Sequence, residues 1–186
     1  MQKPLNSQSP DNVEVIRLVS LARTGDQQAF SDLYEIHFER IYRFAYFRVG
    51  HKETAEDICE EVFVKAYGSI KGLKSDSAFI GWLFRICQNL VIDYYRKKKE
   101  QIGLEDLEHT LAYESNLLEA AHLQMEQKRL LVAIKKLPVD HQRILYLKFF
   151  EQLNNDEIAA ILNKKEPAIR VAQHRAINKL KEVFQQ

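Results

Sequence analysis

The side chains best suited to a chemical task are the positive charges near the C-terminus. Residues 164–182 carry six lysines and arginines against two glutamates, a local net charge of +4, whereas the whole chain has a net charge of +1. On a helix, such cations can neutralise phosphates while the start of the helix reads base edges in the major groove of DNA. A helical corner with a solvated basic face is the other interpretation. The six cations are Lys164, Lys165, Arg170, Arg175, Lys179 and Lys181.

The residues around the start of this basic segment have the spacing of a helix-turn-helix. Ala159 is small enough to lie where two helices cross, and Asn163 suits the corner because Asn tolerates left-handed backbone. Pro167 suits the first turn of the second helix, where the amide it lacks would have had no helical partner. The apolar side chains that would lock the two helices together are Ile158, Leu162, Ile169, Ala176 and Leu180.

A second group of candidate residues is acidic. A helix over residues 54–68 would gather five carboxylates on one side, and Thr54 would cap it, with Asp57 three residues later as in a capping box. Carboxylates near a helix N-terminus are favourable in water, so a solvated face is one interpretation. A docking surface for a basic partner is the other. The five are Glu53, Glu56, Asp57, Glu60 and Glu61.

A third group combines cations with aromatic rings. A helix over residues 77–99, capped by Asp76 or Ser77, would place Arg85, Asn89 and Arg96 away from most of its apolar stripe. Cations beside aromatic rings suit single-stranded DNA, whose bases stack while its phosphates are neutralised. The loop before this helix, over residues 68–77, adds further cations and flexible backbone. We expect the rings themselves to be core rather than platforms for bases; they are Phe79 and Trp82.

No residue pattern indicates catalysis, a metal site or a cofactor site. The sequence has no nucleophile–base pairing, no metal-ligand spacing and no phosphate-binding glycine loop. Cys59 and Cys87 are expected to be reduced thiols packed in helices, with a redox switch between them as the alternative. His37 lies on an apolar face and is expected to be buried and hydrogen-bonded. We therefore predict a protein that is not an enzyme and that needs no cofactor.

The elements that must position these residues are helices. From Val13 onward the apolar residues recur at helical spacing almost throughout, and 186 residues contain only six glycines and four prolines. One predicted stripe consists of Phe30, Leu33, Tyr34, Ile41, Phe44 and Ala45, and a second of Phe79, Leu83, Ile86, Leu90 and Tyr94. The predicted fold class is all-α.

Charge divides the chain into two predicted domains. Residues 100–126 contain seven acidic residues and neither Lys nor Arg, which indicates an acidic linker over residues 100–125. It would join a helical domain over residues 12–99 to a second one over residues 126–186, after a disordered tail over residues 1–11. No apolar run is long enough to span a membrane and the N-terminus is polar, so we expect a cytoplasmic protein without membrane insertion.

Two blocks of the sequence resemble conserved regions of bacterial RNA polymerase sigma factors. AEDICEEVFVKAY (55–67) is similar to the family's AED-x-x-Q-E-V-F pattern, and SAFIGWLFRICQNLVIDYYRKKK (77–99) to its W-L-x-R-I-x-x-N-x-x-x-D-x-x-R pattern, both in the second region. LPVDHQRILYLKFFEQLNNDEIAAIL (137–162) and the basic segment after it resemble the fourth region. With only an acidic linker between them, the blocks resemble the extracytoplasmic-function (ECF) class, which lacks the first and third regions.

The resemblance implies a role and partners. A sigma factor carries RNA polymerase core to promoters and opens them, while the polymerase itself makes RNA. Asp57, Glu60 and Glu61 would dock on the clamp helices of the largest polymerase subunit, and the flap of the second-largest subunit, promoter DNA and an anti-sigma factor would be further partners. The linker would thread the active-site and RNA-exit channel of the polymerase.

The resemblance also implies two sets of DNA-binding residues. Residues 71–78 would take a base flipped from the minus-ten element, within a set for recognition and melting that consists of Lys71, Lys74, Arg85, Asn89 and Arg96. The set for the minus-thirty-five element consists of Lys165, Arg170, His174, Arg175 and Lys179.

Several residues depart from the family pattern. Glu60 replaces a usual glutamine, Asn163 a usual glycine, and Lys165 a common Ser or Thr cap, while Val171, Ala172 and Gln173 differ from the usual recognition-helix residues. The sequence therefore does not predict the promoter. Two rival interpretations remain. One is a self-standing helix-turn-helix regulator whose N-terminal helices dimerise or sense an effector, and the other is a sigma-like protein that only sequesters a partner.

Overall fold

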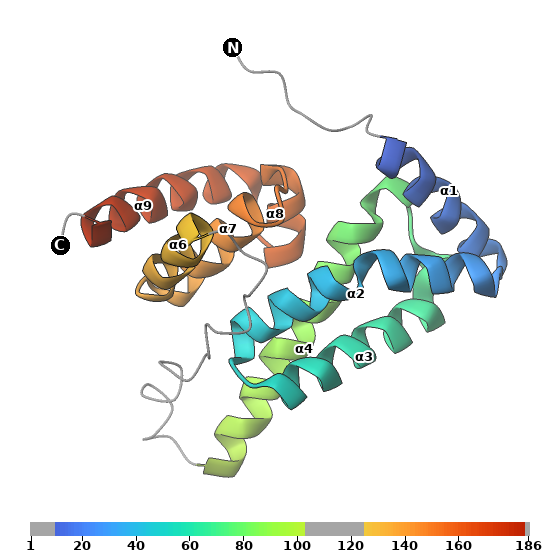
Figure 1. The fold of residues 1–186 in the computed structure, drawn as a ribbon, viewed down its shortest axis with the longest axis horizontal. Coiled ribbons are helices and arrows are strands. Elements are labelled where there is room, and N and C mark those ends of the chain that lie inside the picture. Colours follow the sequence, from blue (N-terminus) through green and yellow to red (C-terminus); the bar gives the residue numbers. More distant parts are fainter. Residues whose placement is uncertain (1–9, 103–124, 185–186) are drawn as a thin grey trace. The chain divides into compact units, whose positions relative to one another are not determined.

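The computed structural model describes residues 10–102 and 125–184, and within these ranges every regular element is helical (Figure 1). The chain divides into two compact units, Met1–Glu114 and Ser115–Gln186. The all-α prediction is thus confirmed. Residues 1–9 and 103–124, which hold most of the predicted tail and most of the predicted acidic linker, lie outside the described residues.

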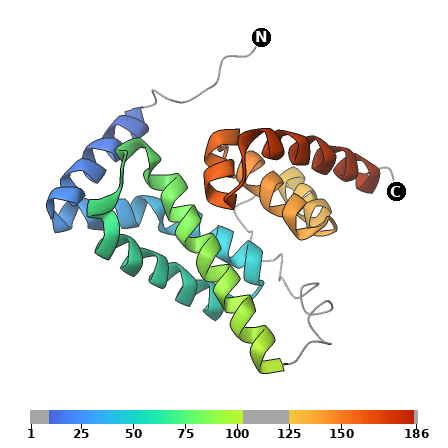
Figure 2. The ribbon, with the colours of Figure 1, turned by 180° about the vertical axis from the view of Figure 1, so that it is seen from behind.

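Over residues 10–102, the described part of the first unit, the chain forms four long helices and two short 3-10 turns (Figures 1 and 2). Helix α2 packs against α1, α3 and α4, so it lies at the centre of this unit. In chain order the elements are α1 (Pro10–Thr24), α2 (Gln27–Val49), α3 (Lys52–Ser69), η1 (Ile70–Gly72), η2 (Asp76–Ala78) and α4 (Phe79–Ile102).

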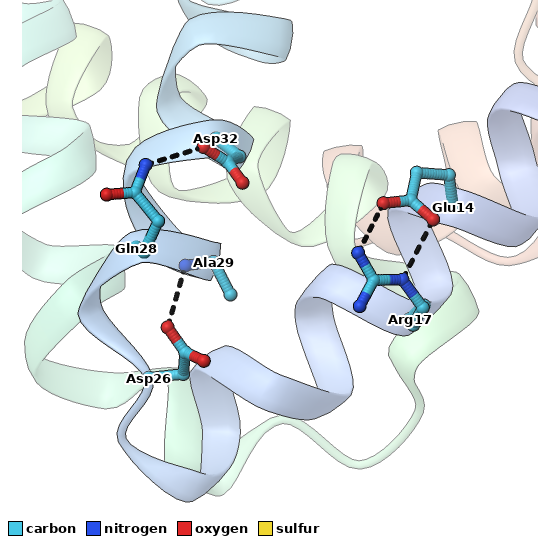
Figure 3. Close-up of polar contacts among 6 residues, drawn as sticks. All are labelled: Glu14, Arg17, Asp26, Gln28, Ala29 and Asp32. Atoms are coloured by element: carbon cyan, nitrogen blue, oxygen red, sulfur yellow. Dashed lines mark hydrogen bonds and ion pairs between the residues drawn. The ribbon is translucent and has the colours of Figure 1, made fainter.

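Local residue chemistry sets the bounds of α2. The Asp26 side chain accepts a hydrogen bond from the Ala29 amide at 3.0 Å, which caps the N-terminus (Figure 3). At the other end Gly50 adopts a left-handed conformation with φ 72°, and its amide donates to the Tyr46 carbonyl at 2.8 Å. The glycine therefore ends α2 and turns the chain back at once.

This sharp turn makes the predicted cap of the next helix wrong. Helix α3 begins at Lys52, two residues before Thr54, and its N-cap is His51, which makes no side-chain cap hydrogen bond. Thr54 instead lies in the first turn, with its Oγ1 at 3.3 Å from Nδ1 of His51. Since Gly50 reverses the chain within one residue, the helix can restart before Thr54 is reached.

Two other helix boundaries also differ from those expected. Helix α1 begins at Pro10, inside the predicted tail, and proline is favourable in a first helical turn. Helix α4 begins only at Phe79 and continues to Ile102, three residues past the expected end at Lys99 and into the predicted linker. The expected capping residues Asp76 and Ser77 lie in η2, the turn that leads into α4.

The core of the first unit is largely the predicted one. The rings of Phe44 and Phe84 meet edge to face at 5.3 Å, and both side chains are fully buried. From the two predicted stripes, the buried residues are Phe30, Leu33, Ile41, Phe44, Ala45, Phe79, Leu83 and Leu90. Tyr34 departs from the prediction because it is exposed, and Ile86 and Tyr94 are half-buried.

The second unit contains the predicted helix-turn-helix. Its elements are α6 (Met125–Lys135), α7 (Val139–Phe149), α8 (Asn155–Leu162) and α9 (Glu166–Phe184). A capping box starts α8, in which Asn154 and Glu157 each accept a hydrogen bond from the other's backbone amide, at 2.9 and 2.7 Å. Asn163 has φ 52° and ψ 47°, so the left-handed corner predicted at this residue is confirmed.

Apolar side chains hold α9 against the rest of this unit. Helix α9 packs on α6, α7 and α8. Among the predicted locking residues, Ile158, Ile169, Ala176 and Leu180 are buried and Leu162 is half-buried. The crossing residue Ala159 is also buried. This packing leaves the basic side of α9 in solvent.

Candidate polymerase-binding and nucleic-acid-binding surfaces

The predicted acidic docking residues lie together on the exposed side of α3. Asp57, Glu60 and Glu61 are all exposed, and Glu61 lies 3.3 Å from the Lys65 ammonium. The opposite side of the helix is buried and consists of Ala55, Ile58, Cys59, Val62, Phe63 and Ala66. Because helical spacing fixes the buried side, the three carboxylates must face outward.

The acidic side of α3 continues into exposed apolar residues that sequence reasoning missed. Val64 is 71% exposed and Tyr67 is 52% exposed. Tyr34 of α2 is also exposed, and its ring lies 4.8 Å from that of Phe63. Carboxylates beside exposed aromatic and aliphatic groups are typical of a protein-docking surface. The sequence could have indicated this exposure, because Val64 and Tyr67 do not lie at the helical spacing of the buried residues of α3.

The loop between α3 and α4 presents the two predicted cations. Lys71 and Lys74 are exposed, whereas Leu73 between them is buried. The backbone is more regular than the expected flexible loop, because η1 and η2 occupy most of it. Asp76 of η2 accepts a hydrogen bond of 2.6 Å from Arg23 of α1, a contact across 53 residues that the sequence did not reveal.

The predicted polar residues of α4 are exposed, and one of them lines a groove. Arg85, Asn89 and Arg96 all face solvent, and Arg96 pairs with Asp93 at 3.0 Å. Asn89 and Trp82 line an open groove of about 440 Å³ between α4 and the end of α3. Trp82 is half-buried, so the expectation of a plain core residue is only partly correct.

The predicted minus-thirty-five residues lie on or beside α9, and all five are exposed: Lys165, Arg170, His174, Arg175 and Lys179. Arg170 donates to one oxygen of Glu166 through Nη2 at 2.8 Å and Nε at 3.2 Å. This interaction lowers the pKa of the Glu166 carboxyl group and raises the pKa of Arg170. Val171, one of the departures from the family pattern, is 51% exposed beside Arg170.

The remaining candidate residues are buried and belong to the core. His37 is 3% exposed, and neither ring nitrogen has a hydrogen-bond partner among the described residues, so the expected hydrogen bond is absent there. Burial, assisted by the charge of Arg40, lowers the pKa of His37 to about 4. Cys59 and Cys87 are free and buried as predicted, and burial raises the pKa of both thiols, that of Cys59 to about 12.

The described residues hold neither a metal-binding cluster nor a membrane-spanning helix. In residues 10–102 and 125–184, no group of His, Cys, Asp and Glu side chains is placed to hold a metal ion. Within the same ranges, no helix has the length and apolar character needed to cross a membrane.

Comparisons with known proteins identify both units. The model of sigma-70 region 2 matches residues 33–101, and the model of sigma-70 region 4 matches residues 127–180. The ECF RNA polymerase sigma factor SigW of Bacillus subtilis is 33% identical over 167 residues, which cover 84% of this chain and 89% of SigW. The ECF RNA polymerase sigma factor BldN of Streptomyces coelicolor is 31% identical over 91% of this chain and 66% of BldN.

A solved structure shares the fold. The sigma factor RpoE from Bartonella quintana, in complex with the anti-sigma factor NepR, has a TM-score of 0.69 and 20% identity, covering 84% of this chain and 96% of RpoE. The two region models span most of the chain, and SigW matches across both regions. The chain therefore belongs to the ECF class of RNA polymerase sigma factors, the proteins that direct transcription initiation.

Proposed function

We propose that residues 12–99 of this sigma factor bind core polymerase and open the promoter, and that residues 126–186 recognise the upstream promoter element. The observation that carries the proposal is the separation of charge over the described surface. The exposed side of α3 is acidic, whereas the loop before α4, the exposed side of α4 and the exposed side of α9 carry cations. DNA is repelled by the first surface and attracted by the others.

The proposed partner of the acidic side of α3 is the pair of clamp helices in the largest polymerase subunit. Asp57, Glu60 and Glu61 would meet basic groups there, and the exposed Val64 and Tyr67 would supply apolar contact area. The flap of the second-largest subunit is the proposed partner of the second unit.

Promoter opening is proposed to occur at the loop over residues 71–78 and along α4. Opening needs only preferential binding of the separated strand, which shifts the equilibrium away from the duplex. Lys71, Lys74, Arg85 and Arg96 would neutralise phosphates of that strand, and Asn89 would contact a base. The groove beside Asn89 offers the Trp82 ring as one wall for such a base.

Upstream recognition is proposed for α9 in the major groove. Arg170 and Arg175 would read base edges of the minus-thirty-five element. Lys165, His174 and Lys179 are exposed around them and would contact the backbone or neighbouring bases. Val171 is exposed where the family usually has a polar residue, and its side chain is suited to a thymine methyl group.

RNA synthesis itself belongs to the polymerase, so the sigma factor is not an enzyme and needs no cofactor. It would act in the cytoplasm, where polymerase and chromosome lie, and an anti-sigma factor would restrain it, as NepR binds RpoE. The acidic linker over residues 100–125 would occupy the positively charged channel of the polymerase.

The test is a Gly/Ser loop variant in which the two exposed loop lysines, Lys71 and Lys74, are replaced by Gly or Ser, with Gly72, Leu73, Ser75 and Asp76 retained. This variant should bind core polymerase and protect the minus-thirty-five element normally, yet fail to open duplex promoters. Permanganate reactivity of unpaired thymines measures opening. A template mismatched across the opening region supplies the unpairing energy of a few kcal/mol and should restore transcription. A variant that opens duplex DNA as well as the wild type does contradicts the proposal.

A further inference from the structure

We propose that the ion pair between Arg23 of α1 and Asp76 of η2 positions the loop over residues 71–78 for strand capture. Arg23 is then a positioning residue for promoter opening, although it belongs to none of the candidate sites or motifs identified from the sequence. This inference rests on the proposed function of the loop. It adds a third element, α1, to the α3–loop–α4 segment that would capture the strand.

The geometry of the pair suits an anchor. Nη1 of Arg23 donates to Oδ1 of Asp76 at 2.6 Å, and the two side chains are only 34% and 22% exposed. Nε of Arg23 is buried, so the guanidinium is packed against protein rather than extended into solvent. Helix α1 also packs against both η1 and η2, and Figure 2 shows the loop running beside it. Exposed ion pairs contribute little because water and salt screen them, whereas this pair is partly shielded from both.

The loop needs such an anchor because its two turns are only locally hydrogen-bonded. The Leu73 amide donates to the Ile70 carbonyl and closes η1, and the Ala78 amide donates to the Ser75 carbonyl and closes η2, both at 3.0 Å. Neither bond joins one turn to the other. Leu73 is 93% buried and secures the first turn by apolar packing, whereas Asp76 secures the second turn by its charge.

The two anchors give the loop an inner and an outer side. Leu73 and Asp76 face the protein, while Lys71, Gly72 and Lys74 are exposed. A captured strand must meet these exposed residues in a fixed arrangement. Because the inner side of the loop is already held in place, less conformational entropy is lost when DNA binds. Loss of the pair should therefore slow strand capture without changing the α3 surface that binds core polymerase.

The opposite charges of the pair allow positioning to be separated from simple attraction of DNA. If Arg23 only attracted DNA, then Asp76→Ala would free that cation and speed opening. If the pair positions the loop, then Arg23→Ala and Asp76→Ala both slow opening. The exchange Arg23→Asp with Asp76→Arg keeps the ion pair with its charges reversed. It should restore much of the opening rate, because the position of the loop depends on the presence of the ion pair and not on which residue carries which charge.

The experiment uses the full chain with core polymerase and a duplex promoter. Each single variant should form open complexes about threefold to tenfold more slowly, the range expected when a partly buried ion pair is lost, and the exchanged pair should lie closer to wild type. Affinity for core polymerase should stay unchanged, and a template mismatched across the opening region should remove the defect. The matched control is Arg17→Ala, which breaks an exposed pair within α1, between Glu14 and Arg17, and should change nothing (Figure 3).

Three results would overturn the inference. They are opening by Asp76→Ala at or above the wild-type rate, no recovery in the exchanged pair, and loss of core binding in both single variants, which would indicate a general folding defect. The Gly/Ser loop variant separates this inference from the function on which it rests. If that variant opens duplex promoters, the proposed function fails as well. If it is defective while both single variants open normally, only the role of the ion pair fails.

Discussion

At the scale of single residues, His37 couples the stability of the first unit to pH. Its ring is buried 5.6 Å from that of Phe79, and its pKa is about 4 instead of the usual 6.5. The unfolded chain therefore binds more protons than the folded chain between these values. The free energy of unfolding is therefore highest above about pH 6.5 and decreases as the pH drops towards 4. Protonation of His37 accounts for about 3 kcal/mol of this decrease.

Replacing His37 by Phe should remove this part of the pH dependence, because an aromatic ring still fills the buried site and the titrating imidazole is lost. Between about pH 7 and about pH 4.5, the wild type should lose about 2–3 kcal/mol more unfolding free energy than His37→Phe does. Urea unfolding followed by the fluorescence of Trp82, the single tryptophan and a residue of the first unit, measures both values. Equal losses in the two proteins would refute the assignment to His37.

Arg170 and Arg175 carry the residue-scale prediction for DNA recognition. Both are exposed on α9, and changing a base-reading arginine costs about 1–3 kcal/mol of DNA-binding free energy. Arg170→Ala with Arg175→Ala should abolish protection of the minus-thirty-five element and cut promoter-specific transcription, with core affinity unchanged. Lys181→Ala, which removes an exposed cation outside the predicted set, is the control. A wild-type footprint from the double variant would contradict the assignment.

Residue type allowed some of these features to be predicted from sequence and hid others. The left-handed corner at Asn163 was predictable because few residues accept that backbone conformation. The burial of His37 followed from its place on an apolar stripe. Its lack of a partner in the described residues did not, since hydrogen bonding depends on the side chains that α4 and the rest of α2 bring near.

At the scale of elements, α3 joins a buried side in the core of the first unit to an exposed side proposed for docking. Asp57→Lys with Glu61→Lys leaves the buried side untouched and should weaken the complex with core polymerase, most clearly at low salt, where charge repulsion is least screened. The control Glu14→Lys with Glu35→Lys makes the same change in net charge on α1 and α2 and should leave affinity unchanged. Co-elution of the α3 variant with core polymerase at wild-type affinity would refute the docking role.

Helical periodicity predicted the elements better than their ends. The buried stripes of α2 and α4 largely matched expectation because every third or fourth residue must face the core. The start of α3 at Lys52 was missed because Gly50 ends one helix and lets the next begin at once. The Arg23–Asp76 pair was missed because a contact across 53 residues arises only from packing of α1 on η2.

At the scale of the whole molecule, a net charge of +1 conceals surfaces of opposite sign. The acidic side of α3 and the basic sides of α4 and α9 cancel in the sum, although each is proposed to meet a different partner. Such a molecule should bind DNA poorly by itself and gain promoter affinity only with core polymerase. A self-standing regulator would show the reverse, since its DNA affinity would not depend on polymerase.

Run-off transcription with purified core polymerase on genomic promoter fragments, the fragment upstream of the protein's own gene included, tests the central claim most directly. Discrete transcripts should appear only when core polymerase and this protein are both present, and the protein alone should leave the same fragments unprotected in a footprint. Transcript yield that is independent of the protein, together with tight binding of the protein alone to the fragments, would contradict a sigma factor and indicate a self-standing regulator.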